Sequence, residues 1–476
     1  MSKIYVFAIG GTGSRVLRSL TMLLAAGCNC KADTIVPIII DPDAAGGNVN
    51  QTVELMDNYE RIRNQIGVDN DNNHESFFKT KISRLTDNYH LRLMSTQNKL
   101  FKEYISLSEM SRANQALARV LFTDKNLNAS MEVGFKGNPH VGSVVLNQFE
   151  NSIDFKNFAN AFADGDKIFI VSSIFGGTGA SGFPLLVKLL RTSTNIANHA
   201  LVNISHIGAI TVLPYFKVEQ NADSQIDSGT FVSKSKSALA YYHRTMSGGC
   251  NVDNMYYIAD DTKSSIYENN EGGVRQQNNA HFVELAAALA IIDFANSDKP
   301  TRTIYKEFGI TSDIDRIKFR DLGPQTSALL MKPLTQFLLF SKYLLECNDL
   351  TQPWARDRNL DQAFFSSVFV NNLSDYFAKF KTWLNELSKQ TRAFIPLRVH
   401  NIDPDTVFDI VEGYTPIKKL LRPDNFTLYN NTLNGMDFVV NRTHVAGTKE
   451  QMFVELFYKT TKKLVEIKYN LGGNKV

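Results

Sequence analysis

The chain of 476 residues has only four cysteines, and their spacing excludes the common metal and redox motifs. Cys28 and Cys30 are one residue apart, which is neither a C-x-x-C redox pair nor a zinc-knuckle spacing, and Cys250 and Cys347 stand alone. The nine histidines form no H-x-x-x-H or H-E-x-x-H pair. We therefore expect free thiols in a reducing compartment and no histidine metal site.

The sequence also lacks long apolar runs and a strong charge of one sign. The longest apolar stretches, 284–295 and 327–345, are interrupted by polar residues and fall short of the roughly 20 apolar residues that span a bilayer. The first residues enter a strand without a charged leader and apolar core, which argues against a secretory signal. A net charge of +3, with no Lys/Arg run among aromatics, does not favour nucleic acid. We expect a cytoplasmic protein that neither binds nucleic acid nor inserts into a membrane.

The length and the pattern of elements predict more than one domain. Alternating strands and helices give way to a helix-rich pattern near residue 300. We expect residues 1–300 to form one domain, with a polar, Asn-rich and partly helical insertion at about 44–130 that lies outside the core sheet. Residues 301–476 are expected to form a smaller, helix-rich α+β domain with a strand candidate at 436–440.

Short apolar segments alternate with glycine turns and helices in the first 300 residues. We predict five strands, at 3–9, 34–40, 167–174, 204–213 and 255–259. A helix at about 15–26 joins the first two strands, and a long apolar helix at 279–296 follows the last. Strands that are apolar on both faces indicate a sheet with helices on both sides. The pattern predicts an α/β fold with a doubly wound, mostly parallel sheet.

Three glycine-rich turns are candidate phosphate-binding loops, because backbone N–H groups at helix N-termini bind anions. They are GGTGS at 10–14, GFKGNPHVG at 134–142 and FGGTGASGFP at 175–184. The first lacks the third glycine of a dinucleotide fingerprint, since Val16 stands there, and alone it is equally an ordinary βα turn. The second, taken alone, is equally a surface loop. The third follows a strand and precedes a helix, but it has no Walker lysine.

In this order, the loops resemble those of the tubulin/FtsZ superfamily. FGGTGASG is similar to the family's GGGTG-T/S-G, followed by a proline as in its bacterial members, and IGGTGSRV is similar to GGGGGNAV. GFKGNPHVG resembles the family's loop at the γ-phosphate. The segments DPDA at 41–44, TVLPYFKVE at 211–219 and IADD at 258–261 resemble the stretch after the second strand, the ribose loop and the loop near the base. The resemblance covers about residues 3–296, and it implies a nucleotide site at the carboxyl edge of the sheet.

The resemblance implies that the first and third loops hold the phosphates of GTP or GDP through backbone N–H groups. The candidate residues are Gly10, Gly11, Thr12, Gly13, Ser14, Gly176, Gly177, Thr178, Gly179 and Ala180. Gly137 and Asn138 would close over the γ-phosphate, where Lys136 either adds a charge or is a solvated side chain.

The metal and ribose contacts are expected from the loops after the second strand and after the strand at 204–213. Asp41 and Asp43 follow a buried strand and are candidate ligands of Mg²⁺, although Asp43 also suits the capping of a turn. By the resemblance, Pro214 belongs to the ribose loop, and Glu219 accepts hydrogen bonds from the ribose hydroxyls.

Recognition of guanine needs a carboxylate or amide oxygen, because the guanine edge offers two N–H donors. The candidates for contacts with the base are Asp260, Asn279, Glu284, His281 and Phe282, the last two by stacking. The family has an aromatic residue and an Asp or Asn four residues apart here, but Leu285 lies four residues after His281. The identity of the base is therefore inferred from the resemblance.

Hydrolysis in the family needs an acid from the neighbouring subunit, in a pattern like N-x-D-x-x-D after the central helix. The nearest candidates are Asp313, Asp315 and Asp321, each of which also suits a turn or a surface, and Ser181 stands where the family has glycine. The leading interpretation is a GTP-binding protein that hydrolyses GTP and self-assembles head to tail. The alternatives are a non-hydrolysing, nucleotide-gated scaffold subunit of a larger bacterial complex and, from the first loop, a NAD- or FAD-dependent oxidoreductase.

Overall fold

The computed structural model describes most of the chain. The described residues are 2–43, 46–67, 75–85, 88–94, 96–131, 134–135, 137–219, 228–245, 251–261, 265–268, 273, 276–309, 314–347, 350–399, 404–418, 423–436 and 447–469.

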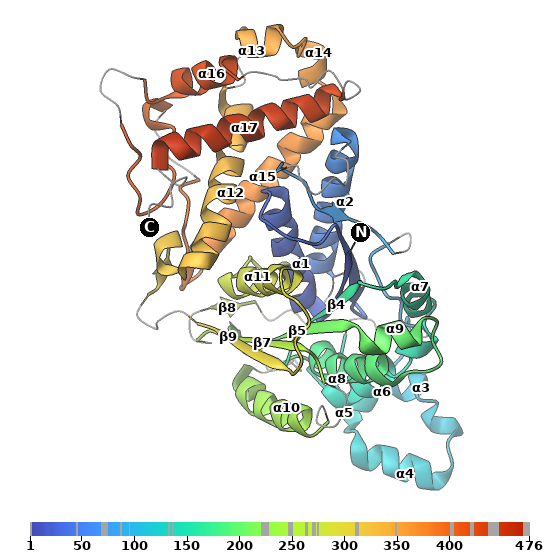
Figure 1. The fold of residues 1–476 in the computed structure, drawn as a ribbon. Coiled ribbons are helices and arrows are strands. Elements are labelled where there is room, and N and C mark those ends of the chain that lie inside the picture. Colours follow the sequence, from blue (N-terminus) through green and yellow to red (C-terminus); the bar gives the residue numbers. More distant parts are fainter. Residues whose placement is uncertain are drawn as a thin grey trace.

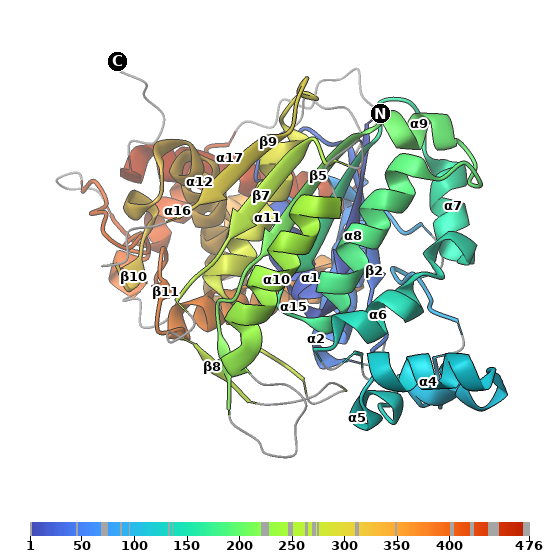
Figure 2. The same ribbon diagram turned by 90° about the horizontal axis from the view of Figure 1, so that it is seen from below.

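A sheet of seven parallel strands forms the centre of the fold (Figures 1 and 2). The order of its strands is β3–β2–β1–β4–β5–β7–β9. Their bounds are Lys3–Ile9 for β1, Thr34–Ile40 for β2, Lys81–Ile82 for β3, Lys167–Ser173 for β4, His206–Val212 for β5, Asn254–Ile258 for β7 and Ile304–Phe308 for β9. Every pairing in this sheet is parallel, so the predicted parallel sheet is confirmed.

Helices cover both faces of the sheet, as strands buried on both sides require (Figure 2). One face carries α1 (Gly10–Ala25), α2 (Gly47–Ile66) and α11 (Phe282–Ala295), and the other carries α6 (Pro139–Leu146), α7 (Ile153–Ala161), α8 (Gly177–Thr192) and α10 (Phe231–Thr245). Tyr5 and Phe7 point from β1 to the α7 side, where each meets Phe158 edge to face with ring centroids 5.0 Å apart. The fold is therefore doubly wound, as predicted.

The winding direction reverses between β1 and β4, which are neighbours in the sheet. The chain adds β2 and β3 on one side of β1, and then adds β5, β7 and β9 on the far side of β4. The loops that follow β1 and β4 therefore diverge to opposite faces and leave a crevice at the carboxyl edge. Such a switch point is where open α/β sheets bind their ligands.

The first part of the segment predicted as an insertion, residues 44–130, contributes to the doubly wound fold. The helix α2 packs on α1, and β3 pairs with β2, so both belong to the doubly wound fold. With two residues, β3 is too short to stand out in the sequence. Farther along, α3 (Phe101–Tyr104), α4 (Arg112–Leu121) and α5 (Asp124–Leu127) project from the body (Figures 1 and 2).

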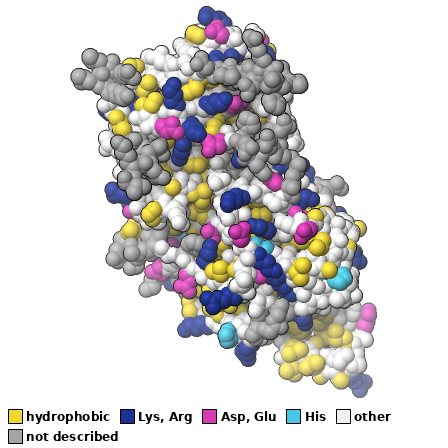
Figure 3. All heavy atoms as spheres, in the orientation of Figure 1, with side chains coloured by type: hydrophobic (Ala, Val, Ile, Leu, Met, Phe, Trp, Pro, Cys, Tyr) yellow, Lys and Arg dark blue, Asp and Glu magenta, His cyan; other side chains and the backbone are white. Residues whose placement is uncertain are grey.

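The projecting helix α4 carries an exposed apolar face. The side chains of Leu117, Val120 and Leu121 are 57%, 83% and 59% exposed. Hydrophobic side chains gather over this projection at the lower right of Figure 3. Because its neighbours in the chain leave these side chains in solvent, α4 adds little to the packing of the core.

Helices dominate the chain after the sheet, as predicted. The longest are α12 (Pro324–Lys342), α15 (Val368–Lys389) and α17 (Lys449–Tyr469), and α12 packs on both of the others (Figure 1). Short strands β10 (Arg316–Ile317) and β11 (Ala393–Phe394) pair separately from the large sheet. Within the described residues, no helix has the length and apolarity needed to cross a bilayer.

The predicted domain division near residue 300 stays a prediction. The sheet continues past that position, because β9 pairs with β7 from Ile304 to Phe308. Residues 437–440 of the strand candidate at 436–440 lie outside the described residues.

Candidate functional site

The structure brings the three glycine loops together at the switch point. A Cβ atom built on Gly10, in the first loop, would lie 3.6 Å from Cβ of Thr178 in the third. A Cβ atom built on Gly177 would lie 3.1 Å from the backbone N of Gly137 and 3.2 Å from that of Asn138, in the second. Residues that are 168 positions apart (Gly10 and Thr178) and 40 positions apart (Gly137 and Gly177) thus lie close together.

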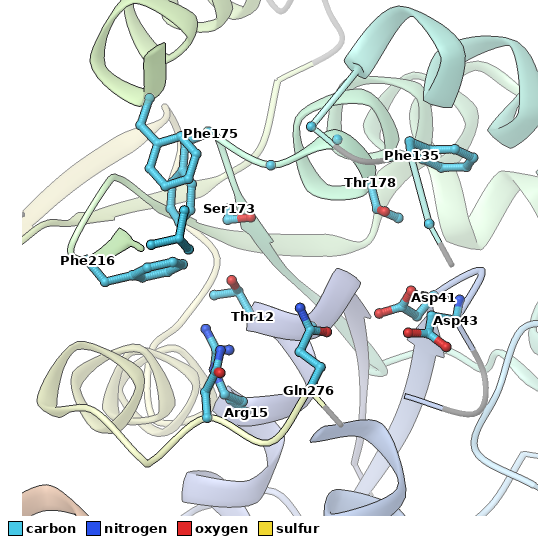
Figure 4. Close-up of a pocket in the computed structure, with 18 of the residues that line it drawn as sticks. Thr12, Arg15, Asp41, Asp43, Phe135, Ser173, Phe175, Thr178, Phe216 and Gln276 are labelled. Carbon is cyan, nitrogen blue, oxygen red and sulfur yellow. Dashed lines mark hydrogen bonds between the residues drawn. The ribbon is translucent and has the colours of Figure 1, made fainter. Parts of the chain in front are cut away.

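A cavity of about 170 Å³ opens where the loops meet (Figure 4). Its wall combines residues of the glycine loops, two carboxylates, one arginine and a group of aromatic side chains. The lining residues are Gly11, Thr12, Arg15, Asp41, Asp43, Gly134, Phe135, Gly137, Ser173, Phe175, Gly176, Gly177, Thr178, Phe216, Val218, Phe231, Glu268, Gln276 and Asn278. In Figure 4, Asp41 and Asp43 lie on one side of Thr12, and Phe175 and Phe216 lie on the other.

Two helices begin at the cavity with their N-termini open. The helix α1 begins at Gly10 and α8 at Gly177, and neither has an acidic residue in its first turn. Their N-cap residues, Ile9 and Gly176, supply no side-chain cap hydrogen bond. The first N–H groups of a helix have no partner within the helix, and together with the helix dipole they favour a bound anion.

The glycines of the first and third loops have different structural roles. A Cβ on Gly11 would meet no neighbouring atom within 4 Å, so this glycine leaves open space in the cavity. A Cβ on Gly13 would lie 2.6 Å from the carbonyl C of Ala8, and one on Gly179 would lie 2.4 Å from the carbonyl O of Ser173. Gly13 and Gly179 therefore let each helix approach its own strand, and they do not line the cavity.

Asp41 and Asp43 form the acidic side of the cavity. Asp41 Oδ1 accepts a hydrogen bond from the Asp43 N–H at 3.0 Å, and Asp43 Oδ2 accepts one from the Gly273 N–H at 2.6 Å. Burial raises the pKa of Asp41 to about 7, against the lowering effect of the Asp43 N–H. No third Asp, Glu, His or Cys joins the pair to make a protein-only metal site within the described residues. Two carboxylates fit Mg²⁺, which commonly takes one or two carboxylates and completes its shell with phosphates and water.

The opposite side of the cavity is aromatic. The ring of Phe175 lies 5.5 Å from that of Phe216 and 4.9 Å from that of Phe231. Arg15 lies below this group, with its guanidinium carbon 5.9 Å from the centre of the Phe216 ring. Its Nε lies 2.5 Å from Glu284 Oε1, and both side chains are buried. The predicted base contact Glu284 thus holds the arginine and does not line the cavity.

No known family profile and no curated protein matches the chain. Solved structures do match. CetZ from Methanosaeta thermophila is 15% identical over 54% of this chain and 46% of its own, with a TM-score of 0.27. CetZ1 from Haloferax volcanii is 13% identical over 54% of this chain and 51% of its own, with a TM-score of 0.28. An FtsZ variant from M. jannaschii is 14% identical over 54% of this chain and 46% of its own, with a TM-score of 0.26.

The chain thus spans about half the length of each of these structures. They belong to the superfamily that the loop motifs resemble. The likeness is one of fold alone.

Several residues predicted for the first and third loops lie behind the cavity wall. Ser14 is fully buried, and the Ala180 carbonyl accepts a hydrogen bond from Tyr242 Oη at 3.0 Å. Asn138 is the N-cap of α6 and touches the third loop without lining the cavity. Lys136 lies outside the described residues.

The residues predicted to contact the ribose and the base do not line the cavity. In two cases a residue next to them in the sequence does. Val218 lines it instead of Glu219 or Pro214, and Asn278 lines it instead of Asn279. His281 is buried against Tyr215, with ring centroids 4.9 Å apart. Asp260 and Phe282 line a different cavity, described below.

The acids predicted for hydrolysis do not meet the first cavity. Asp321 lines the second cavity, with Asp260. Asp315 holds β11 through its carbonyl, which accepts a hydrogen bond from the Ala393 N–H at 2.7 Å. Asp313 lies outside the described residues. Their catalytic role stays a prediction about a neighbouring subunit.

Arg15, Phe175 and Phe216 line the cavity, and their places in the sequence indicate it. Because α1 begins at Gly10, the spacing of Gly11, Thr12 and Arg15 places them on one helix face. Phe175 follows β4 and Phe216 follows β5, and the ends of neighbouring parallel strands meet at the same edge. Other residues have no such indication in the sequence. Lys234 of α10 donates to the Gly137 carbonyl at 3.1 Å, and Gln276 and Asn278 come from the irregular segment before α11.

Proposed function

We propose that the first cavity binds a nucleoside triphosphate together with Mg²⁺, and that the nucleotide is GTP. The observation that carries this proposal is the meeting of three glycine loops and two open helix N-termini around one cavity. Phosphate oxygens are the ligands that such an array of N–H groups suits. A NAD- or FAD-binding site would use only the first loop, and it leaves the second and third without a role.

The charge of the cavity supports the presence of a cation. Asp41, Asp43 and Glu268 supply three carboxylates, and Arg15 is the only arginine or lysine among the lining residues that the structure describes. A triphosphate would be repelled by the acidic side unless a divalent ion lay between them. Asp41 and Asp43 would hold this ion, and it would neutralise charge on the phosphates.

The aromatic side of the cavity gives a place for the base. Phe175 and Phe216 lie opposite the acidic pair in Figure 4. Phe231, whose ring centroid is 4.9 Å from that of Phe175, and Val218 also line the cavity. A nucleotide whose phosphates lie at the N-termini of α1 and α8 would direct its base toward this side. Guanine follows from the resemblance of the loops to the tubulin/FtsZ superfamily.

For hydrolysis, we propose that a second copy of the chain completes the site. Within the described residues, the only carboxylates that line the cavity are Asp41, Asp43 and Glu268, and the first two are assigned to the metal. Turnover should therefore rise more steeply than linearly with protein concentration. A turnover that stays at zero at every concentration would favour the non-hydrolysing scaffold instead.

The binding proposal is tested by extracting and identifying the nucleotide that the purified protein retains. Thr178→Arg places a long side chain in the cavity, and we expect the guanine nucleotide to be lost. Thr192→Arg is the matched control, because Thr192 lies at the exposed far end of the same helix. Retention of guanine nucleotide by the Thr178 variant would place the ligand elsewhere. Release of a flavin or a nicotinamide nucleotide would overturn the proposal in favour of a redox enzyme.

A further inference from the structure

A second cavity, of about 280 Å³, lies between the sheet and the C-terminal helices. It is enclosed by the end of β7, the first half of α11, the end of β9, β10 and the start of α12. Its lining residues are Ile258, Ala259, Asp260, Phe282, Val283, Ala286, Leu289, Glu307, Gly309, Ile317, Asp321, Leu322, Gly323, Thr326 and Arg392. None of them lines the first cavity, so the two spaces are separate.

Asp260 lines this cavity, and one oxygen of its carboxylate has no hydrogen-bond partner among the described residues. Its side chain is 3% exposed, and Oδ1 accepts a hydrogen bond from the Asp261 N–H at 2.7 Å and lies 3.2 Å from Arg392 Nη1. The second oxygen, Oδ2, is buried and has no hydrogen-bond partner among the described residues. Leaving a buried carboxylate oxygen without a donor is costly, so the site is poised to accept an N–H or O–H donor.

The other lining residues define what would carry that donor. The lining includes three carboxylates, of Asp260, Glu307 and Asp321, and one guanidinium, that of Arg392, so its net charge is negative and favours a cation. Outside the lining, Arg320 Nε lies 3.8 Å from Asp321 Oδ1. The apolar part of the lining includes Phe282, Val283, Ala286, Leu289, Ile317 and Leu322. An engineered apolar cavity of about 150 Å³ binds benzene, so a space of 280 Å³ holds a ring with a short chain.

We propose that this cavity is a second ligand site, which takes a small organic cation with a ring-sized apolar body and an ammonium or amidinium group. The apolar body lies against α11 and β10, and the cationic group donates a hydrogen bond to Asp260 Oδ2. Because the ligand touches both α11 and the start of α12, it links the sheet to the C-terminal helices. The proposal does not depend on the nucleotide, since the two cavities share no residue.

The test is calorimetric titration of the full chain with 2-phenylethylamine. We expect saturable binding of one molecule per chain, with a dissociation constant of roughly 0.1 to 1 mM, as small ligands of this size reach. Phenylpropionate has a similar body and the opposite charge, and it should bind at least about tenfold more weakly because of the three carboxylates. Equal affinity for the two compounds, or no saturable binding of the amine, would overturn the proposal.

Two variants locate the site. Thr326 lines the cavity from the first turn of α12, so Thr326→Trp places a large side chain in it and should abolish binding of the amine. Ala328→Trp is the matched control, because Ala328 is exposed on the same helix and does not line the cavity. Asp260→Asn should lower the affinity for the amine at least about tenfold. It should also reduce the ratio of the affinities for the amine and for phenylpropionate. Full affinity in the Thr326 variant would show that the amine binds elsewhere.

Discussion

Arg15 and Glu284 form a buried ion pair that ties the helix of the first glycine loop to α11. Arg15 Nε lies 2.5 Å from Glu284 Oε1, and the two side chains are 5% and 0% exposed. Tyr215 Oη accepts a hydrogen bond from Arg15 Nη2 at 2.6 Å and donates one to Glu284 Oε1 at 2.8 Å. Since Arg15 also lines the first cavity, this network joins the floor of the candidate nucleotide site to the long apolar helix.

Arg15 and Glu284 should contribute to stability as a coupled pair, so that the effects of removing each are not additive. Glu284→Leu leaves a buried guanidinium without its carboxylate, and we expect the free energy of unfolding to fall by about 3–5 kcal/mol. The double variant Arg15→Met, Glu284→Leu removes both charges, so its loss should be clearly smaller than the sum of the single losses. Denaturant unfolding of the three variants measures this. Strictly additive losses would show that the two side chains are not coupled.

Two glycines in the first loop should respond in opposite ways to the same substitution. Gly11→Ala places a methyl group in open space, so the free energy of unfolding should be unchanged or rise by up to about 1 kcal/mol. The methyl group occupies the proposed phosphate position, and nucleotide binding should weaken. Gly13→Ala brings a methyl group to 2.6 Å from the Ala8 carbonyl carbon, which should cost about 1–3 kcal/mol of stability. Equal stability of the two variants would contradict the assigned packing role of Gly13.

The central sheet could be predicted from local pattern, and its edges could not. The strands at 3–9 and 34–40 have the predicted bounds, because each is an apolar run that ends at a glycine or an aspartate. The edge strand Ile304–Phe308 has the sequence IYKEF, in which polar and apolar residues mix, since one edge of it meets solvent. The helix α1 was expected to begin near Arg15, but it begins at Gly10. Glycines predict a turn, but in the structure Gly13 lies in α1 and packs closely on Ala8.

Part of the candidate site could likewise be predicted from local sequence, and part could not. The phosphate loops carry their signal in short glycine motifs, and the structure brings those loops together. The wall near Arg15 depends on partners far apart in the chain, as Glu284 is 269 residues away. Nothing local to Glu284 shows that its carboxylate is already paired, and so it was a candidate for binding the base. Asp260 is a candidate for the base because IADD at 258–261 resembles the family's loop near the base, but in the structure Asp260 lines the second cavity.

Substitution of Asp41 should make nucleotide binding less sensitive to Mg²⁺. In the wild type, we expect the affinity for GTP to fall at least about tenfold when Mg²⁺ is chelated, equivalent to about 1.4 kcal/mol. Asp41→Asn removes one proposed ligand while keeping an oxygen for the Asp43 N–H, so the same chelation should have less effect. Asp357→Asn is the control, because its carboxylate is 61% exposed. The same loss on chelation in the Asp41 variant would argue against a metal at this pair.

Stability should decrease in mild acid because of His281. This residue caps α11, with Nδ1 accepting a hydrogen bond from the Val283 N–H at 3.1 Å and Nε2 lying 3.2 Å from Ser265 Oγ. Burial, with smaller effects of Arg15 and Arg392, lowers the pKa of His281 from 6.5 to about 3. The unfolded chain therefore takes up a proton below pH 6.5 that the folded chain resists.

The contribution of His281 to the free energy of unfolding is fully present above pH 6.5 and is lost as the pH falls from there toward 3. Between pH 8 and pH 5, this one group should lower the free energy of unfolding by about 2 kcal/mol. His281→Asn keeps an acceptor for the Val283 N–H but does not titrate, so the variant should lose less stability over the same interval. Denaturant unfolding of both proteins at pH 8 and pH 5 measures the difference. Parallel losses in the two proteins would mean that His281 is protonated in the folded state, with its ring open to water or to an acid.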